Sequence, residues 1–95
     1  MFVILLKFSN NKARAAELMD AHKSWLKAGF EDGIFLLAGG LEPDLGGAII
    51  AHKATRSELE ERMSADPFVA EGVVNPEIIE ISPGKTDQRL QFLNP

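Results

Sequence analysis

An apolar run at the start of the chain, Phe2–Leu6, limits the folds open to this sequence more than any other segment. In a strand over Phe2–Phe8, side chains alternate between two faces. One face would carry Phe2, Ile4, Leu6 and Phe8, and the other Val3, Leu5 and Lys7. Five apolar residues with no basic segment before them are too few for a signal-peptide core or a membrane span. The run therefore predicts a buried strand with two largely apolar faces.

The segment after this strand predicts a long helix. Ser9-Asn10-Asn11 offers short polar side chains that accept hydrogen bonds from the free amides of a starting helix. The helix should extend from about Asn11 to about Glu31, and Asp32-Gly33 should end it because glycine adopts the left-handed cap conformation readily.

Turn and cap residues divide the rest of the chain. A second strand, Ile34–Ala38, should close at Gly39-Gly40, and a third, Ala48–Lys53, should pair with it as a hairpin. Thr55 or Ser57 should cap a second helix that reaches about Ala65. Asp66 should cap a short helical turn with Pro67 at its first position and Gly72 after it. Val73–Ile81 is the last predicted strand, and Pro76 suggests an edge or a bulge.

The order strand, helix, strand, strand, helix, strand predicts an α+β, ferredoxin-like domain over residues 1–83, followed by a tail over residues 84–95. Its four-stranded antiparallel sheet would have two helices on one face. The other face would still carry apolar side chains, which usually marks an interface. We therefore expect a homodimer packed sheet to sheet, with the tail docked on the domain or on the second subunit.

Composition narrows the class of partner. The chain has 95 residues, 45% of them hydrophobic, which suits one domain. A net charge of −4 with scattered Lys and Arg argues against a nucleic-acid partner. The absence of cysteine excludes disulfides and thiolate chemistry and fits a reducing cytoplasm. We expect a cytoplasmic protein without a membrane partner.

The first predicted helix places an ionisable ring in its apolar stripe. Ala15, Leu18, Trp25 and Gly29 recur at helical spacing, and His22 completes the series. A carboxylate is the natural partner for a buried imidazole, and Asp66 is the candidate. The pair would perform acid–base chemistry, with Asp66 fixing the tautomer. The alternatives are a core histidine bonded to a backbone carbonyl and an aspartate that only caps a helix. Both roles of Asp66 are compatible if one oxygen caps while the other faces His22.

Five further residues are candidates for substrate binding: Phe8, Trp25, Gly39, Gly40 and Phe68. The aromatic rings could equally be core residues, and the glycines could equally be a plain turn. Lys7 and His52 fit solvated strand ends. No metal site is expected, because the two histidines lie on different elements.

These motifs together resemble the YciI-like (YCII-related) family. The resemblance rests on His22, on Ala38-Gly39-Gly40-Leu41, on Gly46-Gly47 and above all on Asp66-Pro67-Phe68-Val69-Ala70-Glu71-Gly72, and it covers Phe2 to about Pro83. It implies a ferredoxin-like fold of the dimeric α/β-barrel type and a catalytic dyad of His22 and Asp66. One branch of the family is a dehydrochlorinase acting on a chlorinated hydroxyhydroquinone. This chain departs from many relatives at Gly39-Gly40, where they have Gly-Pro, and at Leu18 and Met19, where they carry Arg.

The leading functional expectation is a lyase-type enzyme that uses the dyad, without a cofactor, on a small organic substrate such as a phenol. The alternative is a non-catalytic module that binds a small ligand or another protein.

Overall fold

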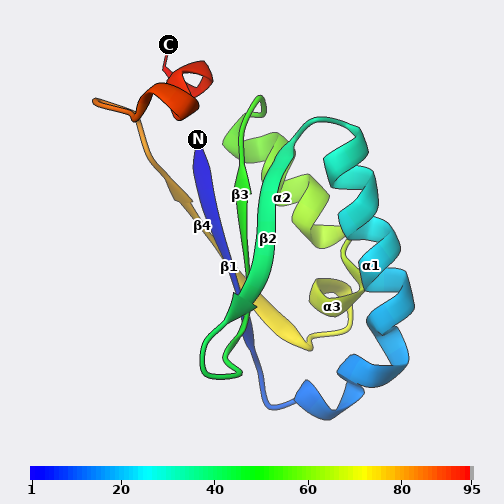
Figure 1. Cartoon of the computed structure of the whole chain (residues 1–95). Helices are drawn as coiled ribbons and strands as arrows, with labels where there is room; N and C mark the ends of the chain where they lie inside the picture. The colour runs from blue at the N-terminus through cyan, green and yellow to red at the C-terminus, as the bar shows by residue number, and fades with distance from the viewer. Residues whose placement is uncertain (95) are drawn as a thin grey trace.

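The computed structural model describes residues 1–94, and Figure 1 shows its elements. The strands are β1 (Phe2–Phe8), β2 (Phe35–Leu41), β3 (Gly46–Ala51) and β4 (Val74–Glu80). The helices are α1 (Ala15–Glu31), α2 (Arg56–Ser64) and the short α3 (Pro67–Ala70), with 3₁₀ helices η1 (Lys12–Arg14) and η2 (Gln88–Leu93). No helix among residues 1–94 is long and apolar enough to cross a membrane.

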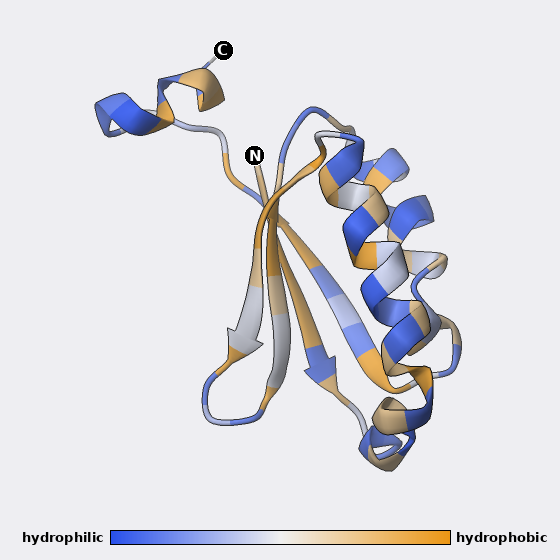
Figure 2. Ribbon diagram, turned by 45° about the vertical axis from the view of Figure 1, so that its right-hand side comes forward, coloured by the Kyte–Doolittle hydropathy of each residue, from blue (hydrophilic) through white to orange (hydrophobic). Residues whose placement is uncertain are grey.

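The four strands form one antiparallel sheet in the order β2-β3-β1-β4. All three α-helices lie on one face of this sheet, and η2 lies beyond its end, near the N-terminus (Figures 1 and 2). The arrangement is the predicted ferredoxin-like fold, with α3 inserted between the second long helix and the last strand.

The helix-facing side of the sheet holds the core. Phe2, Ile4 and Leu6 of β1 are buried there, next to Ile49 of β3, and they pack beneath the helices. Leu59 and Met63 of α2 close the core from above, as their four-residue spacing predicts. The alternation of β1 therefore assigns its two faces as expected.

The opposite side of the sheet has no covering layer within the described residues. One row of aliphatic side chains crosses all four strands in register: Leu37, Ile50, Val3 and Ile79. Leu37 is 56% exposed and Ile79 39% exposed. We call this row the open-face row. An apolar stripe of this kind is unusual on a surface that remains in water.

The β2–β3 hairpin extends further than its glycines suggest. We expected β2 to close at Gly39-Gly40, but it continues to Leu41, and β3 begins at Gly46 rather than Ala48. The prediction was wrong because both glycine pairs take part in the ladder, with Gly40 opposite Gly47. Glycine is depleted in strands for reasons of entropy, which paired partners can offset.

The cap predictions are confirmed at α2 and α3 and wrong at the start of α1. Thr55 rather than Ser57 caps α2, in a reciprocal capping box with Glu58. Neither η1 nor α1 has a side-chain cap; instead the Ser9 hydroxyl accepts from the Asn11 amide and donates to the Gly72 carbonyl. Ser9 therefore ties the end of β1 to the turn before β4.

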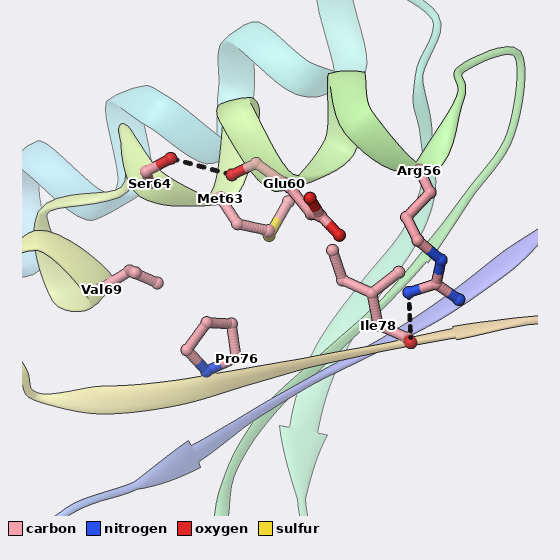
Figure 3. Close-up of a pocket in the computed structure, with 7 residues that line it drawn as sticks. All are labelled: Arg56, Glu60, Met63, Ser64, Val69, Pro76 and Ile78. Atoms are coloured by element: carbon pink, nitrogen blue, oxygen red, sulfur yellow. Dashed lines mark hydrogen bonds between the residues drawn. The ribbon is translucent and has the colours of Figure 1, made fainter.

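Strand β4 lies at an edge of the sheet, as Pro76 predicted. Proline has no amide hydrogen to offer an incoming strand. Figure 3 shows the hollow beneath α2 along this edge, where the guanidinium of Arg56 donates to the carbonyl of Ile78 at 3.0 Å. Pro76 and Arg56 thus occupy hydrogen-bonding positions at which another strand would otherwise pair.

Candidate functional site

The short helix α3 builds one half of the site. Asp66 is its N-cap, and the Asp66 Oδ1 atom accepts the amide hydrogen of Phe68 at 3.0 Å. Pro67 suits the first helical position because its fixed φ is helical and because an amide hydrogen at this position would have no acceptor within the helix. Gly72 follows with φ +69°, a conformation that favours glycine, and the chain turns into β4. The cap predicted at Asp66 is confirmed.

His22 of α1 meets this cap across 44 residues of sequence. Its Nδ1 atom lies 2.8 Å from Asp66 Oδ1, within hydrogen-bonding distance. An ionised carboxylate only accepts, so Nδ1 carries the hydrogen in this bond when Asp66 is ionised. The lone pair of a neutral imidazole is then on Nε2. This arrangement leaves the outer nitrogen of the ring as an acceptor.

The two oxygens of Asp66 have unequal surroundings. We expected one oxygen to cap the helix and the other to face His22, but Oδ1 accepts both hydrogen bonds. Oδ2 is buried without a hydrogen-bond partner among residues 1–94, and the side chain is 0% exposed. A buried oxygen without a donor costs on the order of 1–3 kcal/mol. The difference arises because α1 approaches α3 on the side of Oδ1, so the oxygen that already caps the helix also meets the imidazole.

Two aromatic rings lie against the imidazole. The ring of Phe68 stacks on His22 with centroids 4.0 Å apart and planes at 3°. The Trp25 ring lies at 5.7 Å from His22, and its Nε1 donates to the Arg62 carbonyl of α2 at 2.9 Å. Phe68 therefore supplies both an amide to Asp66 and a flat surface to His22.

His22 faces a pocket with two adjoining lobes. The larger lobe, of ≈ 390 Å³, lies between α1 and the β2–β3 hairpin. The smaller lobe, of ≈ 170 Å³, lies toward α3. Four residues line both lobes and so stand where they meet: Leu6, Met19, His22 and Gly47. The volume of the larger lobe is in the range of small-molecule sites.

The structure brings four of the five predicted substrate-binding residues to this pocket. Gly39 and Gly40 line the larger lobe, and Phe8 and Phe68 the smaller one. Trp25 does not line either lobe; it borders a separate hollow beside α2 and bonds to α2, which is the core role that competed with the substrate role. His52 lies beside Phe92 of η2, with ring centroids 5.7 Å apart.

Sequence reasoning missed several lining residues, including Met19, Lys23 and Gly47. Met19 lies one helical turn before His22, so its helix position was available as a signal, whereas Lys23 is the next residue along and shares no helix face with His22. Gly47 belongs to the Gly46-Gly47 motif of the family resemblance, but no binding role was assigned to it. Its place in the pocket depends on the register that pairs it with Gly40.

The site holds no evident metal-binding cluster. Within the part of the chain that the structure describes, no three His, Cys, Asp or Glu side chains are grouped so that they could hold a metal ion. Proton transfer between the imidazole and a bound molecule is the chemistry that this arrangement can perform directly.

Comparison with solved structures relates this fold to an enzyme. The chain is similar to 5-chloro-2-hydroxyhydroquinone dehydrochlorinase (TftG) from Burkholderia phenoliruptrix AC1100, solved in complex with 2,5-dihydroxybenzoquinone. The TM-score is 0.71 at 17% sequence identity, over 87% of this chain and 94% of that one. At this identity the likeness establishes the fold. A comparison with curated proteins finds no match.

Comparison with protein families identifies the whole domain. The profile of the YCII-related domain matches residues 1–82, which include every strand, all three α-helices and both members of the His22–Asp66 pair. Residues 83–95, with η2, lie outside the match. The chain belongs to the YCII-related family.

Proposed function

We propose that this protein is a cytoplasmic, dimeric small-molecule enzyme in which His22 and Asp66 perform acid–base catalysis. The observation that carries the proposal is the 2.8 Å contact between His22 Nδ1 and a fully buried Asp66, with His22 lining both lobes of the pocket. A carboxylate that holds Nδ1–H orients the ring and stabilises the imidazolium that forms when Nε2 takes a proton. The pair thus has the parts of a general base.

The reaction that we propose is an elimination. His22 Nε2 removes a proton from an O–H or acidic C–H group of the substrate, and the electron pair left behind forms a new π bond. The leaving group departs with its bonding electrons as an anion, such as chloride. The imidazolium then returns its proton to water. The step requires no oxidant or reductant, since the substrate supplies both the proton and the leaving group.

The substrate class that we propose is a small organic molecule such as a phenol. Its support is the size and apolar lining of the pocket, together with the fold shared with a dehydrochlorinase whose structure holds a hydroxylated quinone. Lys23 at the larger lobe would attract an anionic substituent.

Turnover by dyad variants tests the chemistry. Chloride release from 5-chloro-2-hydroxyhydroquinone and from related halogenated phenols would be followed for the wild type, His22→Gln, Asp66→Asn and, as a control, Lys27→Gln on an exposed part of α1. We expect His22→Gln to lower kcat by about 10²–10⁴-fold, as loss of a general base does, and Lys27→Gln to leave it unchanged. Unchanged turnover in His22→Gln would refute the proposal.

A spectroscopic measurement tests the role of Asp66 without a substrate. The ¹⁵N shifts of the His22 ring report which nitrogen carries the hydrogen. We expect the Nδ1–H form in the wild type and a mixture of tautomers in Asp66→Asn, because an amide both donates and accepts. The same tautomer distribution in both proteins would show that Asp66 acts only as a helix cap.

We further propose that two copies associate through the open-face row. A second copy would remove Leu37, Ile50, Val3 and Ile79 from water, and association by apolar faces is the usual fate of such a stripe. Analytical ultracentrifugation should give a dimer for the wild type and a monomer for Val3→Lys, whose charge would lie in the middle of the contact. A wild-type monomer at micromolar concentration would contradict this arrangement.

A non-catalytic role is the alternative. Leu90 and Phe92 of η2 are 45% and 56% exposed, and such residues suit contact with a partner protein or with a ligand-bound subunit. This function predicts that Asp66→Asn keeps its binding partner while no compound in the panel is turned over.

A further inference from the structure

Two rows of paired residues on the helix-facing side of the sheet differ sharply in side-chain volume. One row contains Ala38, Ile49, Ile4 and Ile78, which fill the space beneath the helices. The next row, two residues along each strand, contains Gly40, Gly47, Leu6 and Pro76. A core position in a sheet ordinarily holds a side chain, and on β2 and β3 this row holds none.

Crowding by neighbouring atoms does not explain why positions 40 and 47 lack side chains. A Cβ added at Gly40 would meet no atom closer than the Gly46 carbonyl oxygen at 3.9 Å, and one added at Gly47 would meet the Gly39 oxygen at 3.4 Å. Neither residue has the positive φ that would demand glycine, unlike Gly46 with φ +132°. Space therefore exists above Gly40 and Gly47, and that space belongs to the larger lobe beside His22.

The surface of this glycine pair has a definite chemistry. Ladder hydrogen bonds lie in the plane of a sheet, so the face of the sheet presents peptide planes and Cα hydrogens rather than free donors. Gly40 and Gly47 are paired in this ladder. We call the surface formed by Gly40 and Gly47 the glycine shelf. It is flat and offers no polar group to a ligand above it.

The shelf, the imidazole and a single charge define what fits. His22 and Met19 of α1 border the lobe, and Gly47 lines both lobes. Among the lining residues that the structure describes, Lys23 is the only Lys, Arg, Asp or Glu, and it is exposed. A ring held here would lie with one face on the shelf, its edge toward His22 and any anionic substituent toward Lys23.

We infer that Gly40 and Gly47 are the specificity-determining residues of this site, and that their missing side chains select flat rings over puckered rings of the same size. The inference rests on the proposed function for the identity of the pocket, but it concerns recognition rather than proton transfer. A puckered ring would hold axial hydrogens against the shelf and lose contact area. A side chain at position 40 would take the place of the ring.

Binding of two carboxylates that differ only in ring shape tests the inference. Benzoate is flat and cyclohexanecarboxylate is puckered, and both would be titrated into ¹⁵N-labelled protein while the amide signal of Gly47 and the ring of His22 are followed. We expect the wild type to bind benzoate about tenfold more tightly, the size of effect that pocket shape gives for small apolar groups. Gly40→Val should abolish this preference by weakening benzoate binding.

The matched control is Gly84→Val. Gly84 is exposed in the segment that follows β4, it lines neither lobe, and an added Cβ there meets nothing within 4 Å. Gly84→Val should therefore keep the wild-type preference. If Gly40→Val misfolds, Gly40→Ala provides the same comparison with a smaller loss. The inference is overturned if wild type binds both acids equally, if neither acid shifts the signals at millimolar concentration, or if both glycine variants behave alike.

The outcome separates recognition from catalysis. If the preference for flat rings depends on Gly40 but turnover is unchanged in His22→Gln, the inference about the shelf stands and the proposed catalytic role of His22 is refuted. If turnover depends on His22 but the preference for flat rings persists in Gly40→Val, the inference about the shelf is refuted and the proposed catalytic role of His22 stands.

Discussion

The two faces of the sheet are formed by the same four strands but differ in how their side chains are packed. The helix-facing side combines a dense row of aliphatic side chains with a gap above Gly40 and Gly47, and it carries a buried carboxylate above that layer. The open face carries an aliphatic row without any gap or buried charge. Under the proposed function, the first face would give up packing where it binds a ligand, and the second would keep apolar surface for a second copy. Strand alternation alone would then separate the binding site from the assembly surface in this small domain.

The largest expected difference between the faces is in stability. Ile49 and Ile50 are neighbours on β3, with Ile49 2% exposed beneath the helices and Ile50 in the open-face row. Ile49→Ala should lower the free energy of unfolding by about 2–5 kcal/mol, because it leaves a cavity in the core. Ile50→Ala should cost less than about 1 kcal/mol in the isolated chain.

Urea unfolding at two protein concentrations checks this pair of variants. If a second copy covers the open face, the loss in Ile50→Ala should grow with protein concentration, because association stabilises only the folded state. A loss in Ile50→Ala equal to that in Ile49→Ala at high dilution would mean that the two faces are equally buried within one chain.

A smaller effect is expected at Asp66, where the helix-facing side buries a charge. Asp66→Ala removes the cap of α3 and the partner of His22, and we expect a loss of roughly 1–3 kcal/mol. Asp66→Asn should lose less, because its side-chain oxygen still accepts the Phe68 amide. Thermal unfolding of both variants measures the difference, and equal losses would assign the stabilisation to the charge rather than to the cap.

The smallest effect concerns an exposed pair at the start of α2. The Thr55 amide donates to the Glu58 carboxylate at 3.1 Å, and the Glu58 amide donates to the Thr55 hydroxyl at 3.1 Å. The hydrogen bond from the Thr55 backbone to the Glu58 carboxylate, and after it the Thr55 side chain, hold the pKa of Glu58 below its ordinary value. The stabilisation is therefore present above the unfolded-state pKa and is lost as the pH falls through the folded-state pKa.

Urea midpoints near neutral pH and at about pH 3 would measure this pH dependence. Glu58→Gln should slightly reduce the difference in stability between the two pH values. Glu61→Gln on the same helix is the matched control. A flattening of the same size in Glu61→Gln would assign the effect to net charge.

Local signals predicted most of this molecule. Alternation placed Phe2, Ile4 and Leu6 on the covered face, and Asp66-Pro67 marked the start of α3. Helical spacing placed His22 toward the core, and only its partner required a contact distant in sequence. The family resemblance, rather than periodicity, made that pairing specific.

The errors have one physical source, which is the way one element pairs or packs with another. Glycines in the β2–β3 hairpin look like turns in sequence, and their strand pairing depends on the partner strand. The division of labour between the oxygens of Asp66 likewise depended on how α1 approaches α3, a tertiary distance that no local pattern encodes. Trp25 shows the same limit, because its indole bonds to α2.

The short segment Asp66-Pro67-Phe68 supplies the carboxylate, the turn and the ring that hold His22. Three consecutive residues thus form one local unit around the imidazole, while Gly40 and Gly47 come from a different part of the chain. Under the proposed function, mutations in the β2–β3 hairpin would change the accepted molecule without changing the unit that holds His22. For protein engineering, the proposal directs libraries to positions 38–48 and keeps position 68 constant.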